Sequence, residues 1–142
     1  MYPERLWIRR KAPEPQRPNP RPGYAPPGWP EGVRPPGSSD WEASAATFLF
    51  DCCPADYRAY PVLRRHPVVL GMFAVEFVES QAHASAEGLA RVRTGLADYV
   101  RPEVAQQAVE AWTTEAARLV RLRREVGMVV EALRGRVFAP KL

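Results

Sequence analysis

Cysteine is scarce in this sequence of 142 residues: Cys52 and Cys53 are the only two, and they are adjacent. Adjacent cysteines can bond to each other only through a strained ring, so we expect free thiols rather than a fold held by disulfides. Long apolar runs are also missing, and no stretch approaches the ~18 residues that a membrane-spanning helix needs. The first residues lack the apolar run of a secretory signal. We therefore expect a cytoplasmic protein that does not engage a membrane.

The sequence also lacks signatures of catalysis. Its nine glycines form no glycine-rich loop of the kind that binds phosphate groups. No local motif singles out a serine or cysteine nucleophile with a histidine base. The adjacent cysteines and the two separate histidines, His66 and His83, do not match the ligand spacing of zinc sites. The sequence thus predicts no cofactor and favours a non-enzymatic role, with a thiol enzyme using Cys52 or Cys53 as an alternative.

Proline, in contrast, is abundant, and eleven of the sixteen prolines lie between Pro3 and Pro36. Proline removes a backbone donor and holds φ near the extended value, so this stretch does not favour a regular helix. It also has too few apolar side chains to offset the entropy lost on folding. The sequence predicts a flexible, Pro-rich extended arm over residues 1–37 and a helical bundle domain over residues 38–142.

The predicted arm nevertheless carries large aromatic residues, among them Trp7, Tyr24 and Trp29. Solvated linkers seldom hold such side chains, because exposing them to water is unfavourable. We expect these three residues to be anchors that dock either onto the helical domain or onto a protein partner.

Short helices are expected at the start of the domain. The run Ser38-Ser39-Asp40 can cap a helix from Trp41 to about Cys53. A second short helix is expected over about residues 55–65, with Pro61 splitting it or starting its second turn.

Two long helices follow, and prolines that suit the first helical position open both of them. The first runs from Pro67 to about Ala97, and the second starts at Pro102 and ends near Gly135, a plausible C-cap. Apolar residues recur every three to four positions in each helix, which predicts one buried stripe per helix. The first stripe is Val68, Met72, Val75, Val78, Ala82, Ser85, Leu89, Val92, Leu96 and Tyr99. The second is Ala105, Val109, Trp112, Ala116, Leu119, Arg123, Val126, Val130, Leu133 and Val137.

A tight turn between the long helices makes them antiparallel neighbours, in which the numbers of facing residues sum to about 199. This register sets alanines against alanines near the turn, and it sets Gly88 opposite Trp112, where the absent side chain leaves room for the ring. The predicted fold is therefore all-α: a long antiparallel helical hairpin with one or two short helices packed at its open end, plus the N-terminal arm. Val104 and Val120 lie outside the main stripe, and their burial between two copies would give a homodimer.

Glu76, Glu79 and His83 share one helical face, and carboxylates with histidine bind metals in some helical bundles. The spacing from Glu79 to His83 is four residues, however, whereas the Glu-x-x-His motif of those bundles has three. The hairpin register instead places arginines of the last helix near both glutamates, so ion pairs are the favoured interpretation and a metal-dependent enzyme is an alternative. These arginines are Arg121, Arg123 and Arg124.

The formal net charge is +4. Arg118, Arg121 and Arg124 make part of the last helix basic, and the arm adds further arginines. Such clusters can bind nucleic acid by neutralising phosphates, but glutamates interleave with them and no nucleic-acid-binding motif accompanies them. A nucleic-acid-binding accessory protein is thus an alternative to a protein-interaction role.

The stretch DCCPADYR at residues 51–58, followed by VLRRHP at residues 62–67, resembles a group of small, uncharacterised helical proteins of actinobacteria. The resemblance extends over about residues 48–133 and implies no activity, cofactor or site. The abundance of Ala, Arg, Val and Pro is also typical of a high-GC bacterium. The sequence as a whole predicts a non-enzymatic interaction or accessory protein of the bacterial cytoplasm, whose helical domain and aromatic-bearing arm engage a protein partner.

Overall fold

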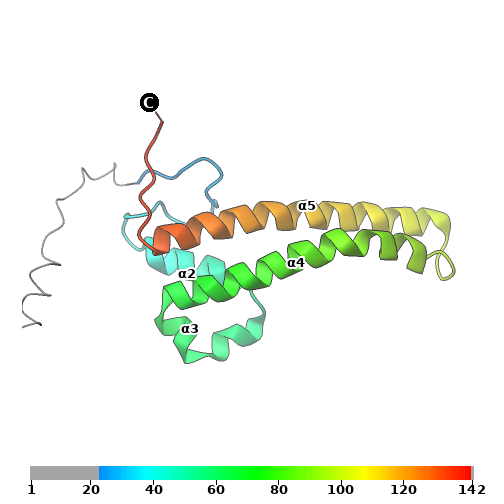
Figure 1. Cartoon of the computed structure of the whole chain (residues 1–142), viewed down its shortest axis with the longest axis horizontal. Helices are drawn as coiled ribbons and strands as arrows, with labels where there is room; N and C mark the ends of the chain where they lie inside the picture. The colour runs from blue at the N-terminus through cyan, green and yellow to red at the C-terminus, as the bar shows by residue number, and fades with distance from the viewer. Residues whose placement is uncertain (1–22, 142) are drawn as a thin grey trace, which may run out of the picture.

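The computed structural model describes residues 23–141 of the chain, and within this part the regular structure is entirely helical. The elements are α2 (Trp41–Asp51), the 3-10 helix η1 (Ala55–Ala59), α3 (Pro61–Arg65), α4 (Pro67–Gly95) and α5 (Pro102–Leu133). The two long helices, α4 and α5, run side by side as a hairpin, and α2 and α3 lie at the end away from the turn (Figure 1). The predicted all-α hairpin is confirmed, including the split of the second short helix at Pro61.

Prolines start α3, α4 and α5, where the missing backbone donor would have no intrahelical partner in any case. The start of α2 differs from the expected cap, because Asp40 adopts a left-handed conformation with φ 61° and its side chain makes no capping hydrogen bond. Beyond α5, Gly135 has φ 100°. The amide of Gly135 donates to the carbonyl of Ala132, and that of Arg136 donates to the carbonyl of Glu131. This pair of bonds is a Schellman motif, so the expected C-cap at Gly135 is confirmed.

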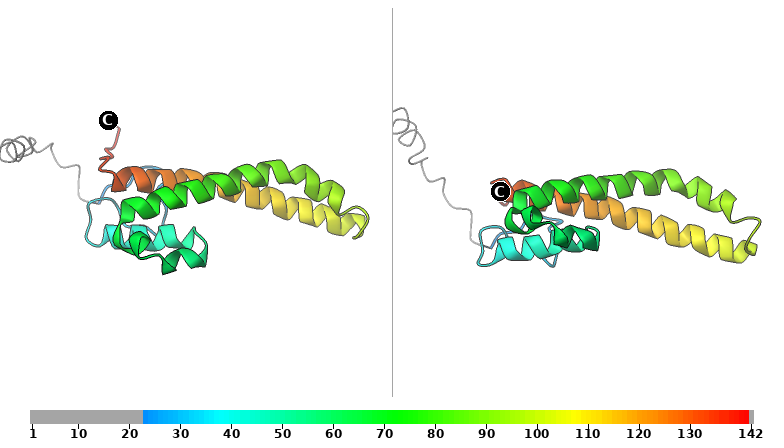
Figure 2. Two further views of the ribbon diagram at one scale, coloured as in Figure 1. Left: turned by 60° about the horizontal axis from the view of Figure 1, so that its bottom comes forward. Right: turned by 90° about the horizontal axis from the view of Figure 1, so that it is seen from below.

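The hydrophobic core lies at the open end of the hairpin, where all the helices meet. Its largest fully buried side chains come from α2, α3, α4 and α5: Leu49, Leu63, Leu70, Val78, Val126 and Val129. Aromatic packing adds η1 to this end, because the Tyr57 ring meets the rings of Phe73 and Phe77 edge-on, with centroids 5.8 Å and 6.2 Å away. The views in Figure 2 agree that the short helices cover only this end of the hairpin.

The buried face at the start of α4 differs from the predicted stripe. Val68 and Met72 are 42% and 40% exposed, and the residues buried in their place are Leu70, Gly71 and Ala74. Residues 67–78 are apolar on nearly every side, so periodicity alone could not fix which side faces inward. Contact decides it: a Cβ on Gly71 would lie 2.9 Å from Cγ2 of Val130, which shows how closely the helices approach there.

Part of the predicted arm belongs to the folded unit. Val33 is only 4% exposed and lies in the core cluster. The Trp29 indole donates to the carbonyl of Val33 at 2.9 Å, and its ring packs edge-on against Phe138 with centroids 6.0 Å apart. The folded unit therefore starts before the expected boundary at Ser38, because residues within the Pro-rich stretch find apolar surface on the helices. Trp7 lies outside the described residues.

None of the helices in the described part of the chain has the length and apolar character that crossing a membrane requires.

Candidate functional site: an apolar groove on the hairpin

The half of the hairpin next to the turn, residues 79–121, extends beyond the short helices (Figure 1); we call it the distal hairpin. The core cluster includes no α4 residue after Val78 and no α5 residue before Leu122. α2 borders the distal hairpin at the end next to Val78, where Phe48 and Cys52 share a hollow with Leu119. Among the described residues, the distal hairpin is therefore a layer of two helices whose faces lack the cover that α2 and α3 give the open end.

Trp112 holds the two helices together in the middle of the distal hairpin. Its indole nitrogen donates to the carbonyl oxygen of Ser85 at 2.7 Å, a bond that crosses from α5 to α4. Its ring lies so close to Gly88 that an added Cβ would be 2.6 Å from Cζ2. The predicted pairing of Gly88 with Trp112 is confirmed, and it fixes the register of the hairpin.

One face of the distal hairpin is hollowed into an open groove of about 1080 Å³. α4 contributes Ala84, Gly88 and Val92 to the groove, and Leu96 follows at the C-cap of this helix. α5 contributes Ala108, Ala111, Trp112 and Leu119. The groove exists because alanine and glycine are too small to fill the space beside the helix–helix contact. The result is an apolar channel along the seam between the helices.

The groove has a defined end at α2. Gln81, Glu115 and Leu119 line it and also line an adjoining hollow of about 250 Å³. The far side of that hollow includes Phe48 and Cys52 of α2. The channel therefore runs from the C-terminal end of α2 to the hairpin turn.

Two charged side chains of opposite sign line the groove, Arg91 from α4 and Glu115 from α5. Glu115 accepts hydrogen bonds from Arg118, including one of 3.0 Å between Nε and Oε2. These bonds from Arg118 lower the pKa of the Glu115 carboxyl, so it is ionised at neutral pH. The sequence did not point to either charged residue of the groove. The pattern that could have done so is that Arg91 lies three residues after Gly88 and Glu115 lies three residues after Trp112.

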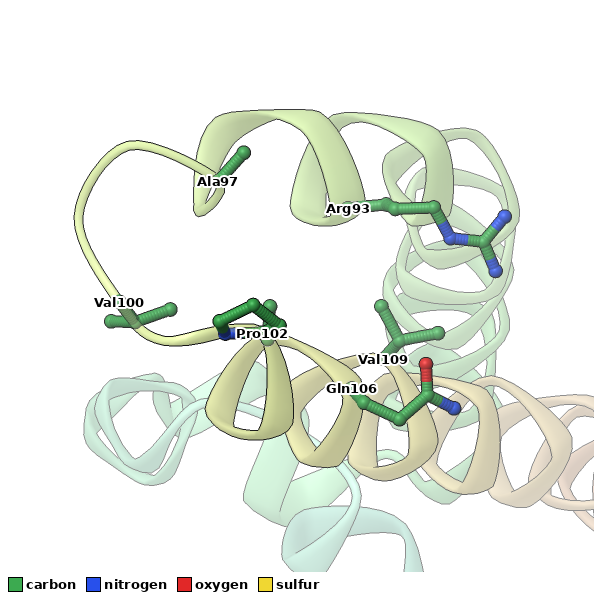
Figure 3. A pocket seen from close by; sticks show the side chains of 7 residues that line it. Arg93, Ala97, Val100, Pro102, Gln106 and Val109 are labelled. Carbon is green, nitrogen blue, oxygen red and sulfur yellow. The ribbon is translucent and has the colours of Figure 1, made fainter.

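The other side of the hairpin carries a smaller hollow beside the turn, of about 280 Å³ (Figure 3). In that view, Val109 and Gln106 rise from α5 toward α4, whereas the guanidinium of Arg93 extends away from the space between the helices. Ala97 and Val100 from the turn and Pro102 and Ala105 from α5 complete its lining. It is much smaller than the groove and has a single charged residue in its lining.

The proposed metal ligands are not brought together. Glu76, Glu79 and His83 are exposed on the side of α4 opposite its buried residues, and His83 pairs instead with Glu87 at 3.3 Å. No group of three or more potential ligands that could hold a metal ion occurs among residues 23–141. The expected ion pairs across the hairpin are wrong as well. Within the described residues neither glutamate lies within 4.0 Å of an arginine, because at about 100° per residue both point away from α5.

Both cysteines are free thiols shielded from water, Cys53 being 9% exposed and Cys52 half-buried. Burial raises the pKa of Cys52 to about 12, and the neighbouring Cys53 and Asp51 act in the same direction. Burial also raises the pKa of Cys53 to about 11. A thiol nucleophile needs the opposite shift, and both side chains belong to or pack against the hydrophobic core cluster.

The arginines proposed to contact nucleic acid form no continuous basic surface. Arg118 is bonded to Glu115. Arg121 and Arg124 line a hollow of about 450 Å³ whose lining also includes two glutamates. Those glutamates are Glu125 and Glu131. The charge on this face of α5 is therefore mixed.

Two of the predicted aromatic anchors, Tyr24 and Trp29, and the valines outside the stripes remain partly accessible. Tyr24 is half-buried, and Trp29 packs on the helical core as described above. Val104 is 39% exposed and Val120 is 37% exposed. These residues add apolar surface that the described residues leave uncovered.

No protein-family model matches the chain, and neither a curated protein nor a solved structure shows significant similarity to it.

Proposed function

We propose that this is a non-enzymatic interaction protein of the bacterial cytoplasm, in which the distal hairpin receives helical segments of a protein partner in its groove. The observation that carries the proposal is the open apolar groove of about 1080 Å³ along the seam of α4 and α5. Exposed apolar surface of this kind is typical of sites that bind other proteins, because burying it in a complex removes it from water.

The shape of the groove favours a helix as the occupant. From Gln81 to Leu96 it is about 22 Å long at 1.5 Å per residue, which matches four turns of an α-helix. Small residues along its floor allow a partner helix to approach closely. Recognition of this kind places apolar side chains of the partner at intervals of three to four residues in the groove.

The aromatic residues of the N-terminal segment add to this proposal as secondary contacts. Tyr24, which is half-buried, is an available anchor for a partner, and Trp7 stays a predicted anchor outside the described residues. Trp29 already packs against the core and Phe138, so it is better placed to position the segment than to bind a partner directly.

Site-specific photo-crosslinking of the full chain tests the proposal. A photoreactive phenylalanine analogue replaces Ala111 in the groove, and a matched control carries it at Thr114, which is exposed but does not line the groove. We expect illumination in cells to give a protein adduct from position 111 and none from position 114. Equal labelling at both positions, or no adduct at position 111, would contradict a binding role for the groove.

A further inference from the structure

The charges of the groove are placed symmetrically about its centre. Gly88 and Trp112 lie at the same level along the hairpin. Arg91 follows Gly88 by three residues toward the turn, and Glu115 follows Trp112 by three residues toward α2. Each charge is therefore about 4.5 Å from the central level at 1.5 Å per residue, in opposite directions.

Such a surface is complementary to itself. Consider a two-fold rotation about an axis that lies in the interface and runs from the α4 side to the α5 side at the Gly88–Trp112 level. This rotation packs one groove on the other and exchanges the two ends of the hairpin. It brings Arg91 of one copy to the level of Glu115 of the other, and the same pair forms a second time by symmetry. Glu115 keeps its bonds to Arg118 on one side, and a carboxylate has further lone pairs for a second arginine.

We propose that the occupant of the groove is a second copy of this chain, packed antiparallel so that the two distal hairpins form a four-helix bundle in which Arg91 of each copy lies at the level of Glu115 of the other, diagonally across the groove. This inference rests on the proposed role of the groove as an interaction surface and names its partner.

The dimensions of the fold agree with this arrangement. Under the same rotation, α4 of one copy lies opposite α4 of the other, and the numbers of their residues at the same level sum to about 176. The turn around Tyr99 of one copy therefore reaches the level of Phe77 in the other. That level is where α2 ends and where the hollow lined by Phe48, Cys52 and Phe77 opens. Tyr99 is 85% exposed in the single chain. Each turn would thus meet the end of α2 in the other copy, near Tyr57 of η1, which packs on Phe77.

A parallel dimer fits less well. It would place Arg91 beside Arg91 at one level and Glu115 beside Glu115 at another, which sets like charges together. It would also bring the two α2 helices to the same end of the bundle. The antiparallel arrangement avoids both problems.

The contact area is sufficient for a specific interface. About 20 residues of each helix span ~30 Å, and two helices side by side are ~20 Å wide, so each copy would bury roughly 600 Å². The total of roughly 1,200 Å² is at the lower end of stable specific interfaces. We therefore expect a dimer that dissociates on dilution.

Charge exchange tests the pairing in the full chain. Sedimentation equilibrium should show wild-type dimers, and Arg91→Glu and Glu115→Arg alone should each weaken self-association by about tenfold or more, because both symmetric pairs become repulsive. An equimolar mixture of the two variants should dimerise about as well as wild type, since every facing pair is then again of opposite sign. Glu110→Arg is the matched control, because Glu110 is exposed outside the groove, and it should leave the dimer intact.

Two results would overturn the inference. One is a wild-type chain that remains monomeric up to high micromolar concentration. The other is a mixture of Arg91→Glu and Glu115→Arg that associates no better than either variant alone, while circular dichroism shows all variants folded. Recovery in the mixture cannot come from a change within one chain, so it isolates the contact between copies.

The crosslink at position 111 separates this inference from the proposed function. In a mixture of ¹⁴N and ¹⁵N full-length chains, adducts that join a light peptide to a heavy one support a second copy. A crosslink to residues 1–22 of the same chain, or to a different protein alone, overturns the dimer. A different protein at position 111 would still agree with the groove as an interaction surface.

Discussion

Replacing Gly88 by alanine should destabilise the protein, although alanine is the better helix former. In a helix interior the exchange is favourable by ~1 kcal/mol from propensity alone. At this position, however, the new Cβ would lie 2.6 Å from Cζ2 of Trp112 and 3.4 Å from Cε2 and Cη2. Carbon atoms prefer separations of about 3.5–4.0 Å, so the ring has to move by about 1 Å.

The cost follows from what that movement breaks. Overpacking of a close contact costs ~1–3 kcal/mol, and loss of the 2.7 Å bond from Trp112 to the Ser85 carbonyl costs about 1 kcal/mol more. Against the gain in propensity, Gly88→Ala should lower the free energy of unfolding by about 1–3 kcal/mol. Gly127→Ala is the matched control, since Gly127 lies within α5 and an added Cβ there meets nothing within 4 Å. This variant should raise the free energy of unfolding by about 0.5–1 kcal/mol.

Urea unfolding followed by far-UV circular dichroism measures both variants. All samples are compared at one protein concentration, because self-association adds to the apparent stability. In a Trp112→Leu background the smaller side chain can move away from the new methyl group, so Gly88→Ala should leave the free energy of unfolding nearly unchanged. The interaction free energy between the two substitutions should then be about 1–3 kcal/mol. If Gly88→Ala stabilises the wild-type chain as much as Gly127→Ala does, the packing argument and the register based on it are refuted.

Further variants test other parts of the structure. Leu70→Ala should cost about 2–5 kcal/mol because Leu70 is fully buried, whereas Val68→Ala should cost less than about 1 kcal/mol; equal losses in urea titrations would contradict the observed phase of α4. Gly135→Ala should cost about 1–2 kcal/mol because φ is 100° there, and thermal melts unchanged by it would rule out the cap. Burial raises the pKa of Cys52 to about 12 and that of Cys53 to about 11, so alkylation at pH 8 should be slow until urea is added. Because the raised pKa keeps the thiols protonated in the folded state while the unfolded thiols ionise, the free energy of unfolding should fall as pH rises from about 9 toward 12. It should fall less in a variant with both cysteines replaced by alanine.

The sequence by itself determined the helices and their order. Prolines that lack a backbone donor can begin a helix but cannot continue one, which set the starts of α3, α4 and α5. The left-handed conformation open to glycine set the end of α5 at Gly135. Periodicity then gave a hairpin, and the pairing of Gly88 with Trp112 gave its register, because a large ring needs a neighbour without a side chain.

Tertiary contact alone decided which sides of these helices are buried at the open end and which remain open near the turn. Residues 67–78 are apolar nearly all round, so only packing against α2, α3 and α5 could select Leu70 and Ala74 over Val68 and Met72. Val33 became a core residue for the same reason, because local chain preferences do not report the apolar surface that distant helices provide. The groove and its two charges also depend on the third dimension, since a hollow arises only where two helices with small side chains meet and α2 ends beside them.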